Sequence, residues 1–123
     1  MKKKILIVDD SESVRINIKN ILGDNYTLID AVHGSHALDV LGANKDIDLI
    51  VLDVNMPEMN GLEFIKIQSE KEEIKHIPTM MCTTEASAEI KSQAKESGVV
   101  RAWIMKPITN KKAFLRAVEI VLK

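Results

Sequence analysis

Short apolar runs divide this chain, and longer segments with mixed apolar and polar positions separate them. Several of the runs are continuously apolar instead of alternating, which is typical of strands buried on both faces of a parallel sheet. The pattern therefore predicts five strands. In chain order, the runs are Ile5 to Val8, Tyr26 to Ala31, Leu49 to Leu52, Thr79 to Cys82 and Ala102 to Met105.

The segments between the runs carry apolar residues at helical spacing, which predicts a helix after each strand. Ser11 or Ser13 is a suitable N-cap for the first helix, and Asn110 for the last. The fourth helix has a thin apolar stripe, and Gly98 is a suitable stop signal after it. The apolar positions of the first predicted helix end at Leu22, and those of the last end at Val121. The three predicted helices between them span Gly34 to Leu41, Leu62 to Gln68 and Ala86 to Ser97.

Strands that alternate with helices predict an open α/β sheet covered by helices on both faces. The length of 123 residues fits one domain, residues 1–123, and an apolar content of 46% is enough for one core. In such sheets, ligands bind outside the carboxyl ends of the strands. The residues that directly follow each run are therefore the candidates for function.

Charge and cysteine content narrow the class of protein. A formal net charge of −1 gives no electrostatic reason to bind nucleic acid or a membrane surface. The single cysteine, Cys82, allows no internal disulfide and suits a reducing compartment. The apolar runs are too short to span a bilayer. We expect a soluble, cytoplasmic and monomeric protein, with Cys82 as a buried strand residue.

Charged side chains and a hydroxyl follow four of the five runs. Asp9 and Asp10 follow the first, Asp53 the third, Thr83 the fourth and Lys106 the fifth. Like charges about 5 Å apart repel by roughly 3 kcal/mol per pair at an effective dielectric of 20, so three carboxylates at one edge require a cation. Carboxylate oxygens favour Mg²⁺, and the lack of thiolate or histidine ligands argues against zinc.

These residues stand in an ordered set of motifs. The set comprises Ile5-Leu6-Ile7-Val8-Asp9-Asp10, the segment from Leu52 to Gly61, Thr83 and Lys106-Pro107, and it resembles the signature of response-regulator receiver domains along the whole chain. The resemblance implies a (βα)5 doubly wound parallel sheet of flavodoxin-like strand order 2-1-3-4-5. It also implies a single receiver domain without an output domain.

The resemblance assigns roles around the acidic cluster. Asp53 would be the phosphoacceptor, and Asp10 and Asp53 would bind Mg²⁺ directly, with Mn²⁺ as a possible substitute. Asp9 would act through water, and the backbone carbonyl of Asn55 would be a further ligand. Asn55 and Glu85 occupy positions that tune dephosphorylation in the family.

Further roles follow from the same resemblance. The Thr83 hydroxyl would bind the phosphoryl group, and Lys106 would pair first with Asp53 and then with a phosphoryl oxygen. The Lys106-Pro107 peptide would be cis. Trp103 stands where the family has its switch aromatic, although a core aromatic in a strand is the alternative interpretation.

The resemblance also implies partners. A sensor histidine kinase would donate the phosphoryl group, a downstream target such as a flagellar motor switch protein would bind the phosphorylated form, and a phosphatase is a further candidate. The protein would catalyse only its own phosphorylation and dephosphorylation. The segments Thr83 to Ala86 and Trp103 to Pro107 particularly resemble chemotaxis receivers.

Two alternatives stay open within and outside this family. The chain could serve as a phosphorelay intermediate or as an adaptor receiver in another pathway. A phosphatase of the haloacid-dehalogenase type also uses a phosphorylated aspartate, but it needs a second acid where Asn55 stands.

His33 and His36 could be mistaken for a metal pair, but no third ligand is evident, so surface histidines are the preferred interpretation.

Overall fold

A five-stranded parallel sheet forms the centre of the computed structural model, which describes residues 2–123. Every neighbouring pair of strands is parallel, and the strand order is β2-β1-β3-β4-β5. The predicted fold class and strand order are therefore confirmed. The strands are β1 (Lys3–Val8), β2 (Tyr26–Ala31), β3 (Leu49–Leu52), β4 (Thr79–Thr83) and β5 (Val100–Met105).

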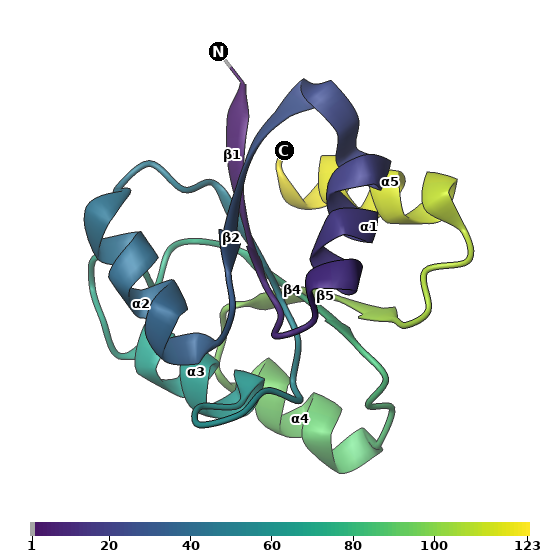
Figure 1. Cartoon of the computed structure of the whole chain (residues 1–123). Coiled ribbons are helices and arrows are strands. Elements are labelled where there is room, and N and C mark those ends of the chain that lie inside the picture. The colour runs from purple at the N-terminus through teal and green to yellow at the C-terminus, as the bar shows by residue number, and fades with distance from the viewer. Residues whose placement is uncertain (1) are drawn as a thin grey trace.

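Helices cover both faces of the sheet, with α1 and α5 on one face and α2, α3 and α4 on the other (Figure 1). A short 3-10 helix, η1 (Gly23–Asn25), follows α1 and was not predicted. The helices are α1 (Glu12–Leu22), α2 (Gly34–Ala43), α3 (Gly61–Ser69), α4 (Ala88–Glu96) and α5 (Lys111–Val121).

Polar side chains decide where these helices begin. Of the two predicted caps for α1, Ser11 accepts a hydrogen bond from the Val14 N–H, and Asn110 caps α5 as expected. α4 begins two residues later than predicted, because the cap is Ser87. Gly98 follows this helix with φ +79°, a left-handed conformation that glycine adopts without the steric cost of a side chain.

The sheet has an apolar layer on each side, which explains why its central strands lack alternation. Along β1, Ile5 and Ile7 pack with α1 and α5, whereas Leu6 and Val8 pack with the opposite layer. All four are at most 1% exposed. In the part of the chain that the structure describes, no helix combines the length and apolarity needed to cross a bilayer.

Candidate functional site

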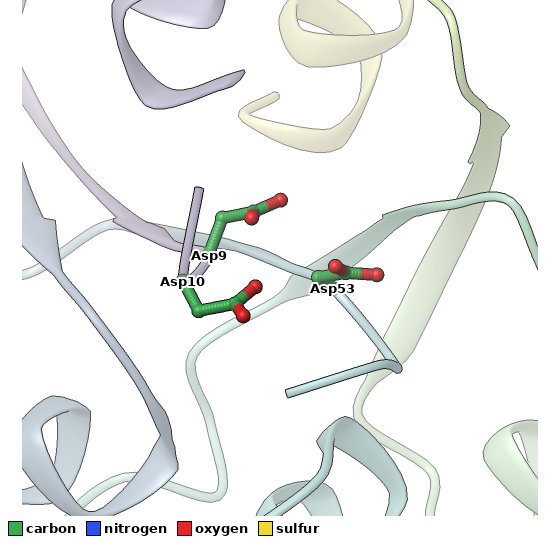
Figure 2. Close-up of side chains that lie close together, drawn as sticks. All are labelled: Asp9, Asp10 and Asp53. Atoms are coloured by element: carbon green, nitrogen blue, oxygen red, sulfur yellow. The ribbon is translucent and has the colours of Figure 1, made fainter. Parts of the chain in front are cut away.

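Three carboxylates meet at the carboxyl edge of the central strands. Asp9 and Asp10 follow β1, Asp53 follows β3, and the pairing of Val8 with Leu52 brings these two strand ends side by side. One carboxylate oxygen from each aspartate lies within 4.8 Å of the others, and the side chains share one region of space (Figure 2). Asp9 and Asp53 are buried, whereas Asp10 is exposed to solvent.

Lys106 supplies the positive charge of this cluster. Its Nζ donates to Asp9 Oδ2 at 2.7 Å and to Asp53 Oδ2 at 3.0 Å. Burial opposes the charged ammonium, but the hydrogen bonds to the two carboxylates outweigh this effect and raise the pKa of Lys106. The ammonium is therefore protonated at neutral pH and neutralises part of the acidic charge.

Asp9 is the carboxylate that the protein desolvates most clearly. Burial raises the pKa of Asp9, although hydrogen bonds from Lys106 and from the Ser11 N–H act in the opposite direction. Because burial disfavours the charged form of Asp9, a further cation nearby would stabilise this carboxylate. The oxygen-only donor set of Asp9, Asp10 and Asp53 fits a hard divalent ion such as Mg²⁺.

The loop after β4 lies between the acidic cluster and Trp103. Thr83 is fully buried at the end of β4, and its Oγ1 accepts a hydrogen bond from the Glu85 N–H at 3.3 Å. The indole Nε1–H of Trp103 donates to the Glu85 carbonyl at 3.0 Å, and Lys91 Nζ lies 5.8 Å from the ring centroid. The half-buried Trp103 therefore contacts both this loop and α4 through these two interactions.

Asn55 joins the two loops beside the site. Its N–H donates to Asp53 Oδ1 at 3.2 Å, and its side-chain amide donates to Glu85 Oε1 at 3.4 Å. The Lys106-Pro107 peptide is cis, and the Lys106 N–H donates to the Thr83 carbonyl. Asp53 is therefore hydrogen-bonded to Asn55 and Lys106, and these two residues connect it to Glu85 and Thr83. Trp103 is connected to this set through the Glu85 carbonyl.

Two further residues support the site in ways that the sequence did not reveal. A Cβ added at Gly61 would lie 2.3 Å from the Asp53 carbonyl oxygen, so only glycine permits this close approach of α3. Arg15 donates from Nη1 to the Asp9 carbonyl at 2.6 Å. The available signal was a charged residue within the core-facing side of α1, whose buried positions are Arg15, Ile18 and Leu22.

The histidines and the cysteine lie outside this chemistry. His33 caps α2 by accepting from the His36 N–H, and His36 Nδ1 accepts from the Val32 N–H. Both are half-buried, so the expectation of plain surface histidines missed a structural role. Cys82 is buried as predicted, and burial raises the pKa of its thiol to about 12.

Comparisons with known proteins give the family of this chain. Residues 5–119 match the response regulator receiver domain family, and the chain belongs to this family. It is a receiver domain homologous to CheY chemotaxis response regulators.

Individual relatives give the degree of similarity. The chemotaxis protein CheY homolog of Campylobacter jejuni is 39% identical over 108 residues, which cover 86% of this chain and 82% of that protein. Chemotaxis protein CheY1 of Helicobacter pylori is 40% identical, with 86% of each chain covered. The solved structure of chemotaxis protein CheY4 of Vibrio cholerae superposes with a TM-score of 0.90 at 36% identity, covering 99% of this chain and 100% of that one.

Proposed function

We propose that this protein is a phosphorylation-dependent switch of a two-component pathway, and that Asp53 receives a phosphoryl group from a sensor histidine kinase. The observation that carries the proposal is the position of Asp53, whose carboxylate lies within 4.8 Å of those of Asp9 and Asp10 and accepts a hydrogen bond from the Lys106 ammonium at 3.0 Å. We infer a cytoplasmic location, because the single cysteine, Cys82, forms no disulfide within the chain and suits a reducing compartment.

The acidic cluster would hold the divalent cation that this reaction needs. Asp10 and Asp53 would bind Mg²⁺ directly, the Asn55 carbonyl would be a further ligand, and Asp9 would act through water. Mn²⁺ is a suitable substitute because it also prefers oxygen ligands. When bound, the ion neutralises charge on the phosphoryl group during transfer.

The side chains of the chain itself perform the transfer. A carboxylate oxygen of Asp53 attacks the phosphorus of the phosphohistidine, an O–P bond forms, and the P–N bond to the donor breaks. The donor imidazole leaves and takes up a proton from water. The Lys106 ammonium and the Thr83 hydroxyl then donate hydrogen bonds to phosphoryl oxygens, since both are at the same edge of the sheet.

The output follows from the link between this edge and α4. A phosphoryl group that attracts the Thr83 hydroxyl disturbs the loop whose carbonyl binds Trp103. This favours a second arrangement of α4 and β5, which is a population shift between two states. The relatives named as chemotaxis proteins favour a chemotaxis pathway. For that pathway we propose a flagellar motor switch protein as the target and a phosphatase as a further partner. A phosphorelay or adaptor role in another pathway is the second candidate.

Incubation with acetyl phosphate and Mg²⁺ tests the phosphoacceptor. Intact mass should show the addition of one phosphoryl group to the wild type and none to Asp53→Asn. The matched control is Asp39→Asn, an exposed acid on α2, which should be labelled like the wild type. Omission of divalent metal should abolish labelling. Full labelling of Asp53→Asn would overturn the assignment.

A further inference from the structure

A buried arginine connects α1 and β2 to the backbone of the acidic cluster. The Arg15 side chain is 10% exposed, and its Nη1 donates to the Asp9 carbonyl at 2.6 Å. Its Nε donates to Asp30 Oδ2 at 3.0 Å, so one guanidinium binds both groups. Lys19 Nζ also donates to Asp30 Oδ1, at 2.9 Å, so this carboxylate accepts hydrogen bonds from two cations.

Core packing alone gives no reason for a guanidinium at this position. Burial of the Arg15 guanidinium against a half-buried Asp30 carries a desolvation penalty, and an apolar side chain of similar volume often stabilises a protein as well or better. Arg15 shares the core-facing side of α1 with Ile18 and Leu22, where such a residue would fit. The contacts that Arg15 makes are therefore the basis for assigning it a role.

Those contacts fix the peptide that joins the first two acids. The Asp9 carbonyl, which belongs to the Asp9–Asp10 peptide, accepts from Arg15 at 2.6 Å, while the N–H of the preceding peptide donates to the Ala31 carbonyl at 3.1 Å. The plane of the Asp9–Asp10 peptide is thereby held at its carbonyl end by a charge-assisted hydrogen bond. The Cα of Asp10 is one of the atoms of this peptide plane. The orientation of the plane therefore influences the direction in which the Asp10 side chain leaves the backbone.

We propose that Arg15, supported by Asp30, is a positioning residue that keeps the Asp9–Asp10 peptide oriented so that both carboxylates face Asp53. This inference rests on the proposed function of the same site as a divalent-metal site. Arg15 touches neither the phosphoryl group nor the metal in this assignment, and it acts through the backbone. Loss of such a supporting partner typically lowers metal affinity about 10- to 100-fold.

Binding of Mn²⁺ to the full chain, followed by electron paramagnetic resonance of the free ion, measures this effect without any phosphotransfer. Arg15→Met should bind Mn²⁺ about 10- to 100-fold more weakly than the wild type. Arg15→Lys retains the charge and one donor group and should give an intermediate affinity. The control is Arg101→Met, because the exposed Arg101 also donates to a backbone carbonyl, that of Gly98, at 2.6 Å but in another part of the molecule.

The sign of the change separates positioning from simple charge repulsion. Removal of a positive charge near a cation site would strengthen Mn²⁺ binding, whereas loss of positioning weakens it. Unchanged or tighter binding by folded Arg15→Met would overturn the proposal. If this variant does not fold, Arg15→Lys and Asp30→Asn carry the test, and wild-type affinity in both would overturn it.

A separate measurement keeps this inference distinct from the proposed function. Wild-type protein that binds Mn²⁺ but takes no phosphoryl group from acetyl phosphate would contradict the proposed function and leave the role of Arg15 supported by its own binding data. Normal labelling and metal binding in both the wild type and Arg15→Met would contradict only the role of Arg15.

Discussion

The Lys106 ammonium lies closer to Asp9 than to Asp53, at 2.7 Å from one carboxylate and 3.0 Å from the other, although 97 positions separate Lys106 from Asp9 in the sequence. One cation thus bridges two buried acids. In the absence of divalent metal, this bridge partly balances a cluster of three acids. The stability of the protein and the chemistry of its site are therefore linked through the same charges.

Replacement of Asp53 by asparagine should stabilise the metal-free protein. The substitution removes one of three crowded negative charges and leaves Lys106 paired with Asp9. The relief of repulsion exceeds the lost attraction to Lys106, so we expect an increase of about 1 kcal/mol in the free energy of unfolding. Urea unfolding in a chelator measures it, with Asp39→Asn as the control. Saturating Mg²⁺ should reduce or reverse the difference, and a less stable Asp53→Asn in chelator would contradict the charge argument.

Loss of Lys106 should destabilise the protein in a pH-dependent manner. The pKa of Lys106 is raised above its ordinary value of 10.5, so its stabilising contribution is complete below pH 10.5 and is lost as the pH rises through the folded-state value. Lys106→Met should cost about 3 kcal/mol at pH 7, because it leaves buried acids without their partner. The gap to the wild type should narrow above pH 10.5.

Urea unfolding between pH 7 and the alkaline limit of stability measures this gap for Lys106→Met. Lys95→Met, which removes an exposed lysine of α4, is the control and should show little change at any pH. A gap that stays constant across the alkaline range would show that Lys106 contributes packing rather than charge.

Two glycine substitutions should act in opposite directions. An added Cβ at Gly61 would meet the Asp53 carbonyl oxygen at 2.3 Å and the Val54 Cα at 2.8 Å, so Gly61→Ala must displace the backbone of the site. We expect a loss of about 1–3 kcal/mol and weaker phosphorylation. Gly42→Ala lies near the end of α2 in open space and should stabilise by about 0.5–1 kcal/mol. Thermal unfolding and acetyl phosphate labelling of both variants test this contrast.

The fluorescence of Trp103, the only tryptophan, should report activation. Its indole donates to the Glu85 carbonyl, so a change at Thr83 reaches the ring through one loop. Titration with beryllofluoride and Mg²⁺ should change the emission and shift amide resonances from Ala86 to Lys112. Asp53→Asn should show neither change. Resonance shifts confined to the neighbourhood of Asp53 would contradict the switch while leaving phosphorylation intact.

The phosphorylated form should be short-lived. Asn55 and Glu85 are hydrogen-bonded to each other beside Asp53, in a position to influence the water that attacks the acyl phosphate. Substitution of Glu85 by alanine should change the rate of phosphate loss, whereas Glu89→Gln on exposed α4 should not. Intact mass over time after removal of acetyl phosphate gives the rate. Persistence of the wild-type phosphoprotein for many hours would favour the phosphorelay role.

The order of elements was predictable from the sequence because burial on both faces leaves a continuous apolar signal. β1, β3 and β4 are central strands, and their apolar runs marked them clearly. The edge strand β5 was less distinct: it begins at Val100, two residues before the predicted start. The start of α4 was also predicted wrongly, at Ala86 instead of Ala88. Several neighbouring residues could precede the first helical turn, and the structure shows that Ser87 is the N-cap.

The sequence also determined which residues would meet, because parallel strands place their carboxyl ends at one edge and Asp9, Asp10, Asp53, Thr83 and Lys106 all follow such ends. Only the tertiary structure decided how they pair. Three contacts depend on differences of a few tenths of an ångström. They are the shorter contact of Lys106 with Asp9, the hydrogen bond from Arg15 to the Asp9 carbonyl, and the close approach of Gly61 to Asp53. Distances on that scale depend on how the helices pack on the sheet, and no local pattern in the chain encodes them.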